Sequence, residues 1–158
     1  MKTIETKVYE YYELSDDAKE KARQWYKSTD FGDEWWEPDY EDAKTVGLKL
    51  EYFGLDRNRH ATGEFIISAI DCALKIENEH GDKTETYKTA RTFINETRKM
   101  DSDSAEYEDA CDEFRRSILE DYSIILQKDY EYTMSDEYVM EAIEANGYTF
   151  TIDGKRFG

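Results

Sequence analysis

The stretch from residue 101 to residue 144 constrains the fold of this chain most strongly. It contains fifteen Asp or Glu and only three Arg or Lys, so it carries most of the chain's formal net charge of −17. Apolar residues recur within it at helical spacing, and from about Ser104 to Tyr132 they form one stripe. The sequence therefore predicts one long helix that buries this stripe and displays its carboxylates on an ordered surface.

Shorter elements are expected on both sides of this helix. Alternation of apolar and polar side chains is typical of strands, and it predicts strands at residues 3–14, 48–53 and 148–152. The apolar segment of residues 64–68 is expected to be a further strand that forms an antiparallel hairpin with residues 48–53. Helical spacing, capping residues and terminating glycines predict five further helices: residues 16–28, 38–46, 69–80, 84–100 and 135–147. A hairpin-type turn is expected at Asp153 and Gly154.

These elements predict an α+β fold. We expect a single domain over residues 1–158, in which a three- or four-stranded antiparallel sheet is covered mainly on one face by five or six helices. A chain of 158 residues suits one domain, and no linker, repeat or low-complexity tract divides it. Aromatic residues make up 15% of the chain, which argues against an acidic disordered segment.

The net charge also limits the partners. A charge of −17 repels nucleic acid and anionic membranes, so we expect no direct contact with either. No apolar run approaches the roughly 20 residues that a membrane-spanning helix needs, and the first residues lack the apolar core of a signal peptide. Cys72 and Cys111, the two cysteines, fit a reducing compartment. We therefore expect a cytoplasmic protein, and the sequence leaves its oligomeric state open.

The sequence contains no catalytic signature. It lacks the phosphate-binding, dinucleotide-binding, nucleophile-elbow and zinc-protease motifs. His60 and His80 do not combine with the cysteines at zinc-ligand spacing, and the acidic residues do not follow the calcium-loop pattern. We accordingly predict no catalytic residue, no metal site and no cofactor.

A second acidic segment lies between Ser28 and Ala43 and contains no Lys or Arg. Its acids are Asp30, Asp33, Glu34, Glu37, Asp39, Glu41 and Asp42. Trp35, Trp36 and Tyr40 lie among them, and such aromatic residues are typical anchors of protein interfaces. The alternative is that one Trp packs in the core and the other covers a helix end, while the acids are simply solvated.

The long helix contributes the other acids of the expected partner-binding surface. They are Glu106, Asp109, Asp112, Glu113 and Glu120. Over its ~43 Å length the helix has about one net charge per ~7 Å, whereas duplex DNA has one per ~1.7 Å. The helix alone is therefore too dilute to imitate DNA. Mimicry requires the segment of residues 30–42 to lie beside it.

Five segments, taken in order, resemble a family of small uncharacterised proteins from phages, prophages and other mobile elements. They are ELSDDAKEKARQWY, WWEPDYEDAKTVGLKL, LDRNR, EHGDKTETYKTA and ANGYTFTIDGKRF. The resemblance implies a genomic setting and transfers no activity and no functional residue. Small acidic proteins from that setting are often inhibitors of host defence, including anti-restriction and anti-CRISPR proteins.

These observations lead to one leading hypothesis. The protein is expected to be a non-enzymatic inhibitor that occupies the basic, nucleic-acid-binding surface of a host defence protein in the bacterial cytoplasm. One alternative is a passive accessory or structural phage protein, or an antitoxin-like protein, whose charge serves only solubility. The other is an enzyme with a carboxylate–metal site.

Overall fold

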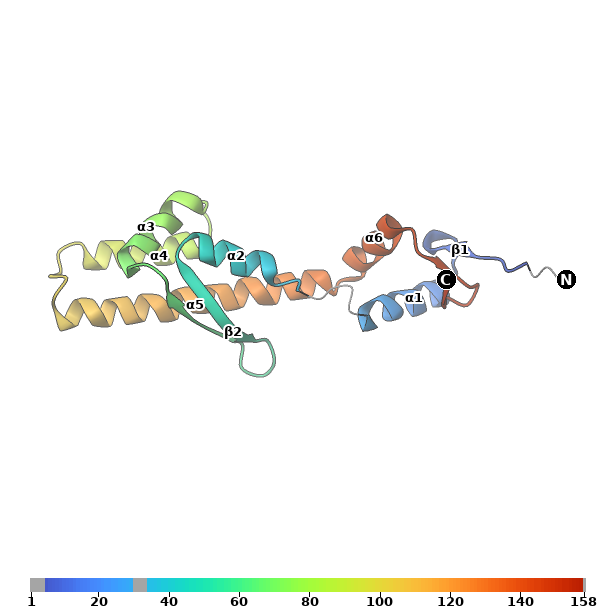
Figure 1. Cartoon of the computed structure of the whole chain (residues 1–158), viewed down its shortest axis with the longest axis horizontal. Coiled ribbons are helices and arrows are strands. Elements are labelled where there is room, and N and C mark those ends of the chain that lie inside the picture. Colours follow the sequence, from blue (N-terminus) through green and yellow to red (C-terminus); the bar gives the residue numbers. More distant parts are fainter. Residues whose placement is uncertain (1–4, 30–33, 158) are drawn as a thin grey trace. The chain divides into compact units, whose positions relative to one another are not determined.

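The computed structural model describes residues 5–29 and 34–157. Within these ranges the chain is α+β, with six α-helices, a three-stranded antiparallel sheet and a two-stranded hairpin (Figure 1). The predicted α+β class is confirmed. The chain divides into two compact units, one made of residues 36–129 and the other of the N-terminal 35 residues with residues 130–158. The expected single domain stays a prediction.

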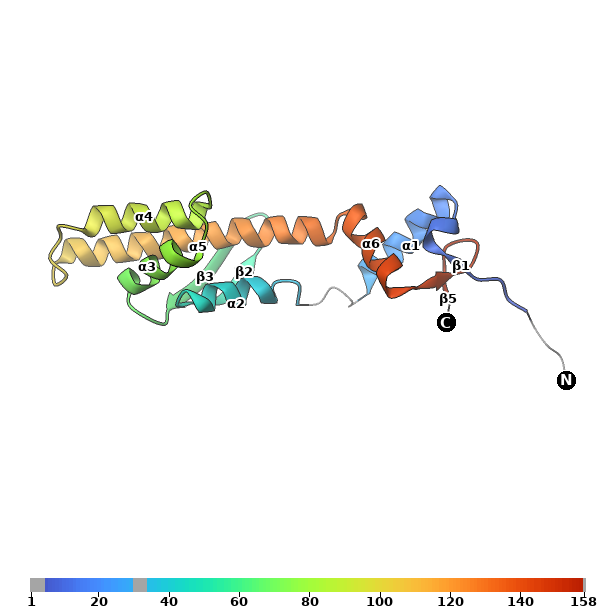
Figure 2. The same cartoon turned by 90° about the horizontal axis from the view of Figure 1, so that it is seen from above.

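The unit of residues 36–129 contains four helices and the hairpin. Its elements are α2 (Glu37–Thr45), β2 (Leu48–Gly54), β3 (His60–Phe65), α3 (Ala69–Glu79), α4 (Glu85–Thr97) and most of α5 (Ala105–Thr133). Helices α4 and α5 lie side by side (Figures 1 and 2), and Phe93 stacks on Phe114 at a centroid distance of 4.5 Å between them. The buried side chains of Leu48, Ile76 and Ile118 complete this core.

Local signals place these helices. The Thr84 hydroxyl accepts the Tyr87 N–H and begins α4, and Pro38 lies in the first turn of α2. After α2 ends, Gly47 adopts a φ of 92°, which glycine tolerates without a steric penalty. These boundaries agree with the sequence-based ones within a few residues.

The other unit combines two helices with short strands. Its elements are β1 (Tyr9–Glu10), the 3-10 helix η1 (Tyr11–Glu13), α1 (Asp16–Ser28), α6 (Asp136–Asn146), β4 (Thr149–Phe150) and β5 (Arg156–Phe157). The strands pair in the order β1-β4-β5. Trp25 packs edge-on against Tyr148 and Phe150, next to the buried Ile143.

Three strand predictions need correction. The segment expected at residues 3–14 is a strand only at Tyr9–Glu10 among the described residues, because the Glu13 carboxylate accepts the Glu10 N–H and turns the chain into η1. The third strand is His60–Phe65 rather than residues 64–68, because its pairing with β2 extends back to Gly54 opposite His60. The segment at 148–152 pairs over two residues only.

The hairpin also stands apart from the three-stranded sheet, with no shared pairing among the described residues. The expected three-stranded antiparallel sheet is β1-β4-β5, and the hairpin is a second sheet in the other unit, so each unit has its own core. No helix in the described part of the chain is both long and apolar enough to cross a membrane.

Candidate partner-binding surface

The structure places the predicted anchor residues against their own chain. Trp36 and Tyr40 both pack against Phe53 of β2, each at a ring-centroid distance of 6.1 Å. Trp35 and Tyr130 both belong to the other unit, and their ring centroids lie 5.4 Å apart. All three predicted anchors are half-buried, so much of their surface is used within the fold. Asp30 and Asp33 lie outside the described residues, while Glu34, Glu37 and Glu41 are exposed.

Helix α2 brings Asp42 to the C-terminal half of α5. The Tyr122 hydroxyl, on a fully buried side chain, donates a hydrogen bond of 2.8 Å to the Asp42 carboxylate. The His80 Nε2 atom lies 3.2 Å from the same oxygen, and His80 lowers the pKa of Asp42 below its usual value. Two acidic segments that are distant in the sequence therefore meet here, but the Asp42 carboxylate serves to join α2 to α5.

Asp39 meets Asp129 of α5 at the same junction. Burial, followed by the hydrogen bond and the charge of Asp129, raises the pKa of Asp39 to about 8. Asp39 is therefore mostly protonated at neutral pH and adds little negative charge to the surface. The expected convergence of the two acidic segments thus neutralises one of the carboxyl groups.

Further along α5, other carboxylates are also engaged. Glu120 forms a 2.7 Å ion pair with Arg59, whose guanidinium also contacts Gln127 and the buried Ser123. Asp121 accepts a 2.5 Å hydrogen bond from the Thr89 hydroxyl of α4. These contacts tie the hairpin and α4 to α5.

The N-terminal half of α5, residues 105–117, presents its acids differently. Glu106, Asp109, Asp112 and Glu113 are all exposed. Their basic neighbours are on the same helix: Arg116 lies 2.8 Å from Glu113, and an Arg115 nitrogen is 4.0 Å from Asp112. Exposed pairs of this kind contribute at most about 1 kcal/mol and exchange readily with other partners.

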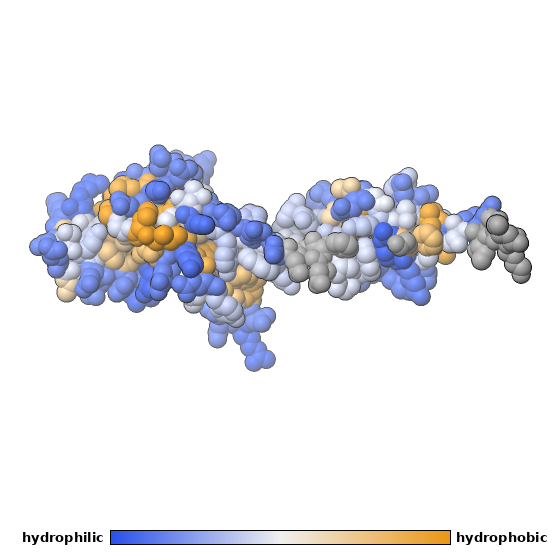
Figure 3. All heavy atoms as spheres, in the orientation of Figure 1, coloured by the Kyte–Doolittle hydropathy of each residue, from blue (hydrophilic) through white to orange (hydrophobic). Residues whose placement is uncertain are grey.

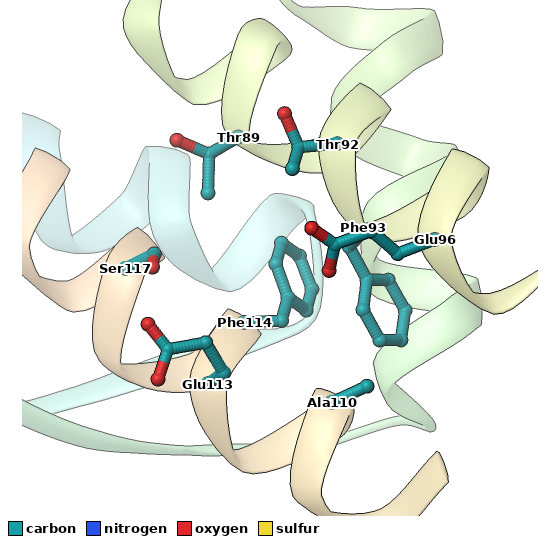
Figure 4. Close-up of a pocket in the computed structure, with 8 residues that line it drawn as sticks. All are labelled: Thr89, Thr92, Phe93, Glu96, Ala110, Glu113, Phe114 and Ser117. Atoms are coloured by element: carbon teal, nitrogen blue, oxygen red, sulfur yellow. The ribbon is translucent and has the colours of Figure 1, made fainter. Parts of the chain in front are cut away.

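A cavity of about 280 Å³ opens between α4 and this half of α5, and we call it the α4–α5 pocket (Figure 4). Its lining residues are Thr89, Thr92, Phe93, Glu96, Ala110, Glu113, Phe114 and Ser117. The stacked rings of Phe93 and Phe114 are each only 3% exposed and form its apolar floor. Figure 4 shows the carboxylates of Glu96 and Glu113 coming from the two different helices.

This combination suits a basic side chain. A Lys or Arg has an apolar stem that packs on hydrophobic surface and a charged head that stays near water. The apolar floor fits the stem, while the two carboxylates accept hydrogen bonds from the head. The volume is slightly below the roughly 300–1,000 Å³ of drug-sized ligand sites, which favours a single side chain.

A second cavity of about 470 Å³ lies on the other side of the Thr89–Asp121 hydrogen bond. Its lining includes Lys83 and Lys128 as well as Asp42, His80 and Asp121. The two lysines oppose a cationic occupant, so the α4–α5 pocket is the better candidate for a basic side chain.

Sequence reasoning included Glu113 but missed Glu96, which lies in the electrically neutral middle of the chain. Only the packing of α4 against α5 pairs these two carboxylates across one cavity. Among the described residues, no group of three or more His, Cys, Asp or Glu is arranged to hold a metal ion. Figure 3 shows that the surface is mostly hydrophilic, with a hydrophobic patch beside α3; Ile66 and Leu74 are exposed apolar residues of this unit.

Comparison with known proteins found no matching family model, no matching curated protein and no matching solved structure.

Proposed function

We propose that this protein is a non-enzymatic binding protein that occupies the basic, nucleic-acid-binding surface of another protein. The proposed partner is a host defence protein of the restriction or CRISPR type. The protein would be encoded by a phage or mobile element and would act in the bacterial cytoplasm. The α4–α5 pocket supports this proposal most directly, because its apolar floor and two carboxylates suit an Arg or Lys from such a surface.

The neighbouring acids supply the long-range part of the interaction. Glu106, Asp109 and Asp112 are exposed on the same half of α5, and the chain's net charge of −17 attracts a basic partner before contact. Such steering accelerates association and weakens as salt rises, since charges more than about 8–10 Å apart are screened at physiological ionic strength. The pocket then provides a short-range contact that salt affects less.

The test is capture of partners from a bacterial host lysate with immobilised protein at low and high salt. We expect a nucleic-acid-binding protein that is eluted by salt and displaced by duplex DNA. The double variant Glu96→Gln and Glu113→Gln should weaken its binding about tenfold, because two hydrogen-bonded charges are lost.

A matched control removes two exposed acids elsewhere, Glu79 of α3 and Glu141 of α6. The double variant Glu79→Gln and Glu141→Gln has the same net charge as the pocket variant and should bind almost as well as the unmodified protein. Equal weakening of binding by both double variants would show that the interaction is only nonspecific charge attraction. A captured partner that is not displaced by nucleic acid would contradict the proposed decoy action.

A further inference from the structure

The unit that contains α1 and α6 has a cavity of its own, which we call the tyrosine pocket. Its volume is about 440 Å³, and its lining residues are Glu10, Tyr11, Tyr12, Glu144, Gly147 and Tyr148. Pairing of β1 with β4 sets Glu10 opposite Thr149. Tyr11 and Tyr12, which follow Glu10, therefore lie near Tyr148, which precedes Thr149. This site is independent of the α4–α5 pocket, because all its residues belong to the other unit.

Three tyrosines are among the residues that line the pocket. Tyr11 is only 2% exposed, and its hydroxyl accepts a 2.7 Å hydrogen bond from Arg23. Tyr148 is half-buried against Trp25. Tyr12 is 63% exposed, and its hydroxyl is hydrogen-bonded to Glu10, which raises the pKa of Tyr12. The pocket thus combines one buried, one half-buried and one exposed tyrosine ring.

The charged side chains that line this pocket favour a cation. Glu10 and Glu144 contribute two exposed carboxylates, and among the described residues no Lys or Arg lines the cavity. The C-terminal end of α6 also carries a negative partial charge from the helix dipole. Basic residues usually occupy that position, but the last turn of α6 contains none, and Glu144 lies there instead. A bound cation would offset this unfavourable placement.

Two of these rings already interact with cations of the chain itself. The Arg156 guanidinium lies 4.9 Å from the Tyr148 ring centroid, and the Lys19 ammonium lies 5.8 Å from that of Tyr11. Neither basic side chain is among the residues that line the pocket.

We propose that the tyrosine pocket binds a trimethylammonium group. Tyrosine rings grouped around a cavity attract such groups through their negative faces, and the two carboxylates add charge complementarity. A compact ammonium is strongly hydrated and loses more on entering an aromatic site, whereas a trimethylated one has an apolar surface that matches the rings. The group can come from a small choline-like molecule or from a trimethylated lysine side chain.

The test is a titration of the full chain followed by NMR, with choline as the first probe. Its neutral isostere, 3,3-dimethylbutan-1-ol, has the same shape without the charge. We expect choline to bind at least tenfold more tightly and to shift the signals of Tyr12, Gly147 and Tyr148. Equal binding of the two compounds, or shifts elsewhere, would overturn the proposal.

A second probe, acetylated trimethyllysine methylamide, distinguishes the two sources. Tighter binding than choline identifies a modified lysine as the ligand, and weaker binding identifies a free small molecule. Either result supports the trimethylammonium site, while binding of neither cation contradicts it.

Variants locate the site. Tyr12→Leu should weaken choline binding about fivefold to tenfold, because it removes one ring, and Tyr12→Phe should retain binding because it keeps the ring face. Glu144→Gln should weaken binding about threefold, while Glu141→Gln on the same helix should have no effect. Since Tyr12 is 63% exposed, its variants should keep the fold. Unchanged choline binding in Tyr12→Leu would refute the assignment.

Discussion

The two halves of α5 carry similar formal charge but use it differently. In the C-terminal half, from residue 118 onward, carboxyl groups bind to the rest of the unit: Glu120 contacts Arg59, Asp121 contacts Thr89 and Asp129 contacts Asp39. In the N-terminal half, residues 105–117, the acids are exposed, and those that form ion pairs do so with arginines of the same helix. A count of acids therefore overstates the negative field of the C-terminal half. It describes the field of the N-terminal half more accurately.

The carboxylates of the two halves therefore have different roles, one group in stability and the other in binding. A carboxylate that joins two elements contributes to folding and cannot be given up to a partner without loss of stability. An exposed carboxylate costs little to redirect, so it is available for binding. Substitutions in the C-terminal half should accordingly change stability, and substitutions in the N-terminal half should change binding.

The largest effect is expected for Tyr122→Phe. This change removes the hydroxyl that donates to Asp42 from a fully buried ring, and the loss of a hydrogen bond to a charged group should lower the free energy of unfolding by about 1.5–3 kcal/mol. Urea denaturation measures it, with Tyr52→Phe as a control at a tyrosine that is 61% exposed. Equal effects of the two substitutions would remove the structural role assigned to Asp42.

The next effect depends on pH and concerns Asp39. The pKa of Asp39 is about 8 in the folded protein and about 3.9 in the unfolded chain, so its contribution to stability is complete below pH ~3.9 and is lost as pH rises toward 8. Asn retains an uncharged group that can donate to Asp129. Asp39→Asn should therefore raise the free energy of unfolding at pH 8 by about 1–2 kcal/mol, a figure reduced for solvent screening of a half-exposed group.

Urea denaturation at pH 5 and at pH 8 tests this sign. The stabilisation by Asp39→Asn should be clearly smaller at pH 5, where Asp39 is protonated in the folded protein and the penalty has largely disappeared. An equal change at both pH values would show that Asp39 titrates as an ordinary carboxyl group.

A smaller effect is expected for Arg59→Ala. The guanidinium bridges the hairpin to Glu120 of α5, but this pair is partly exposed. The loss should be up to about 1 kcal/mol and should be reduced in high salt, as thermal denaturation at two salt concentrations would show. A loss that is independent of salt would instead indicate packing by the Arg59 stem.

The smallest effect on stability is expected at the α4–α5 pocket. Glu96 and Glu113 lie on its exposed rim, so Glu96→Gln and Glu113→Gln should each change the free energy of unfolding by less than about 0.5 kcal/mol. The same urea series measures it. A marked destabilisation would assign these carboxylates to the structural group and weaken their role in binding.

The sequence predicted local structure well and contacts poorly. Ser15, Thr84 and Ser135 were readable as helix starts, since capping depends on neighbouring residues. The segment at residues 3–14 was misread because alternation predicts a strand only when a partner strand is present, and β4 offers two residues.

The candidate site shows the same limit. Exposed acids such as Glu106 and Asp109 were predictable from helical spacing. The pairing of Glu96 with Glu113, the neutralisation of Asp39 and the bridge from Arg59 to α5 each depend on packing between segments far apart in the chain. Periodicity within one segment does not encode such contacts.

The most direct test of the central claim is an NMR titration of the full chain with a tetra-arginine peptide. If binding of a basic partner depends on the N-terminal half of α5 and the α4–α5 pocket, the amide signals of Thr92, Glu96, Ala110 and Glu113 should shift most, and those near Asp39 and Asp129 should stay in place. Shifts spread evenly over all exposed acids, or centred on the C-terminal half of α5, would contradict the account.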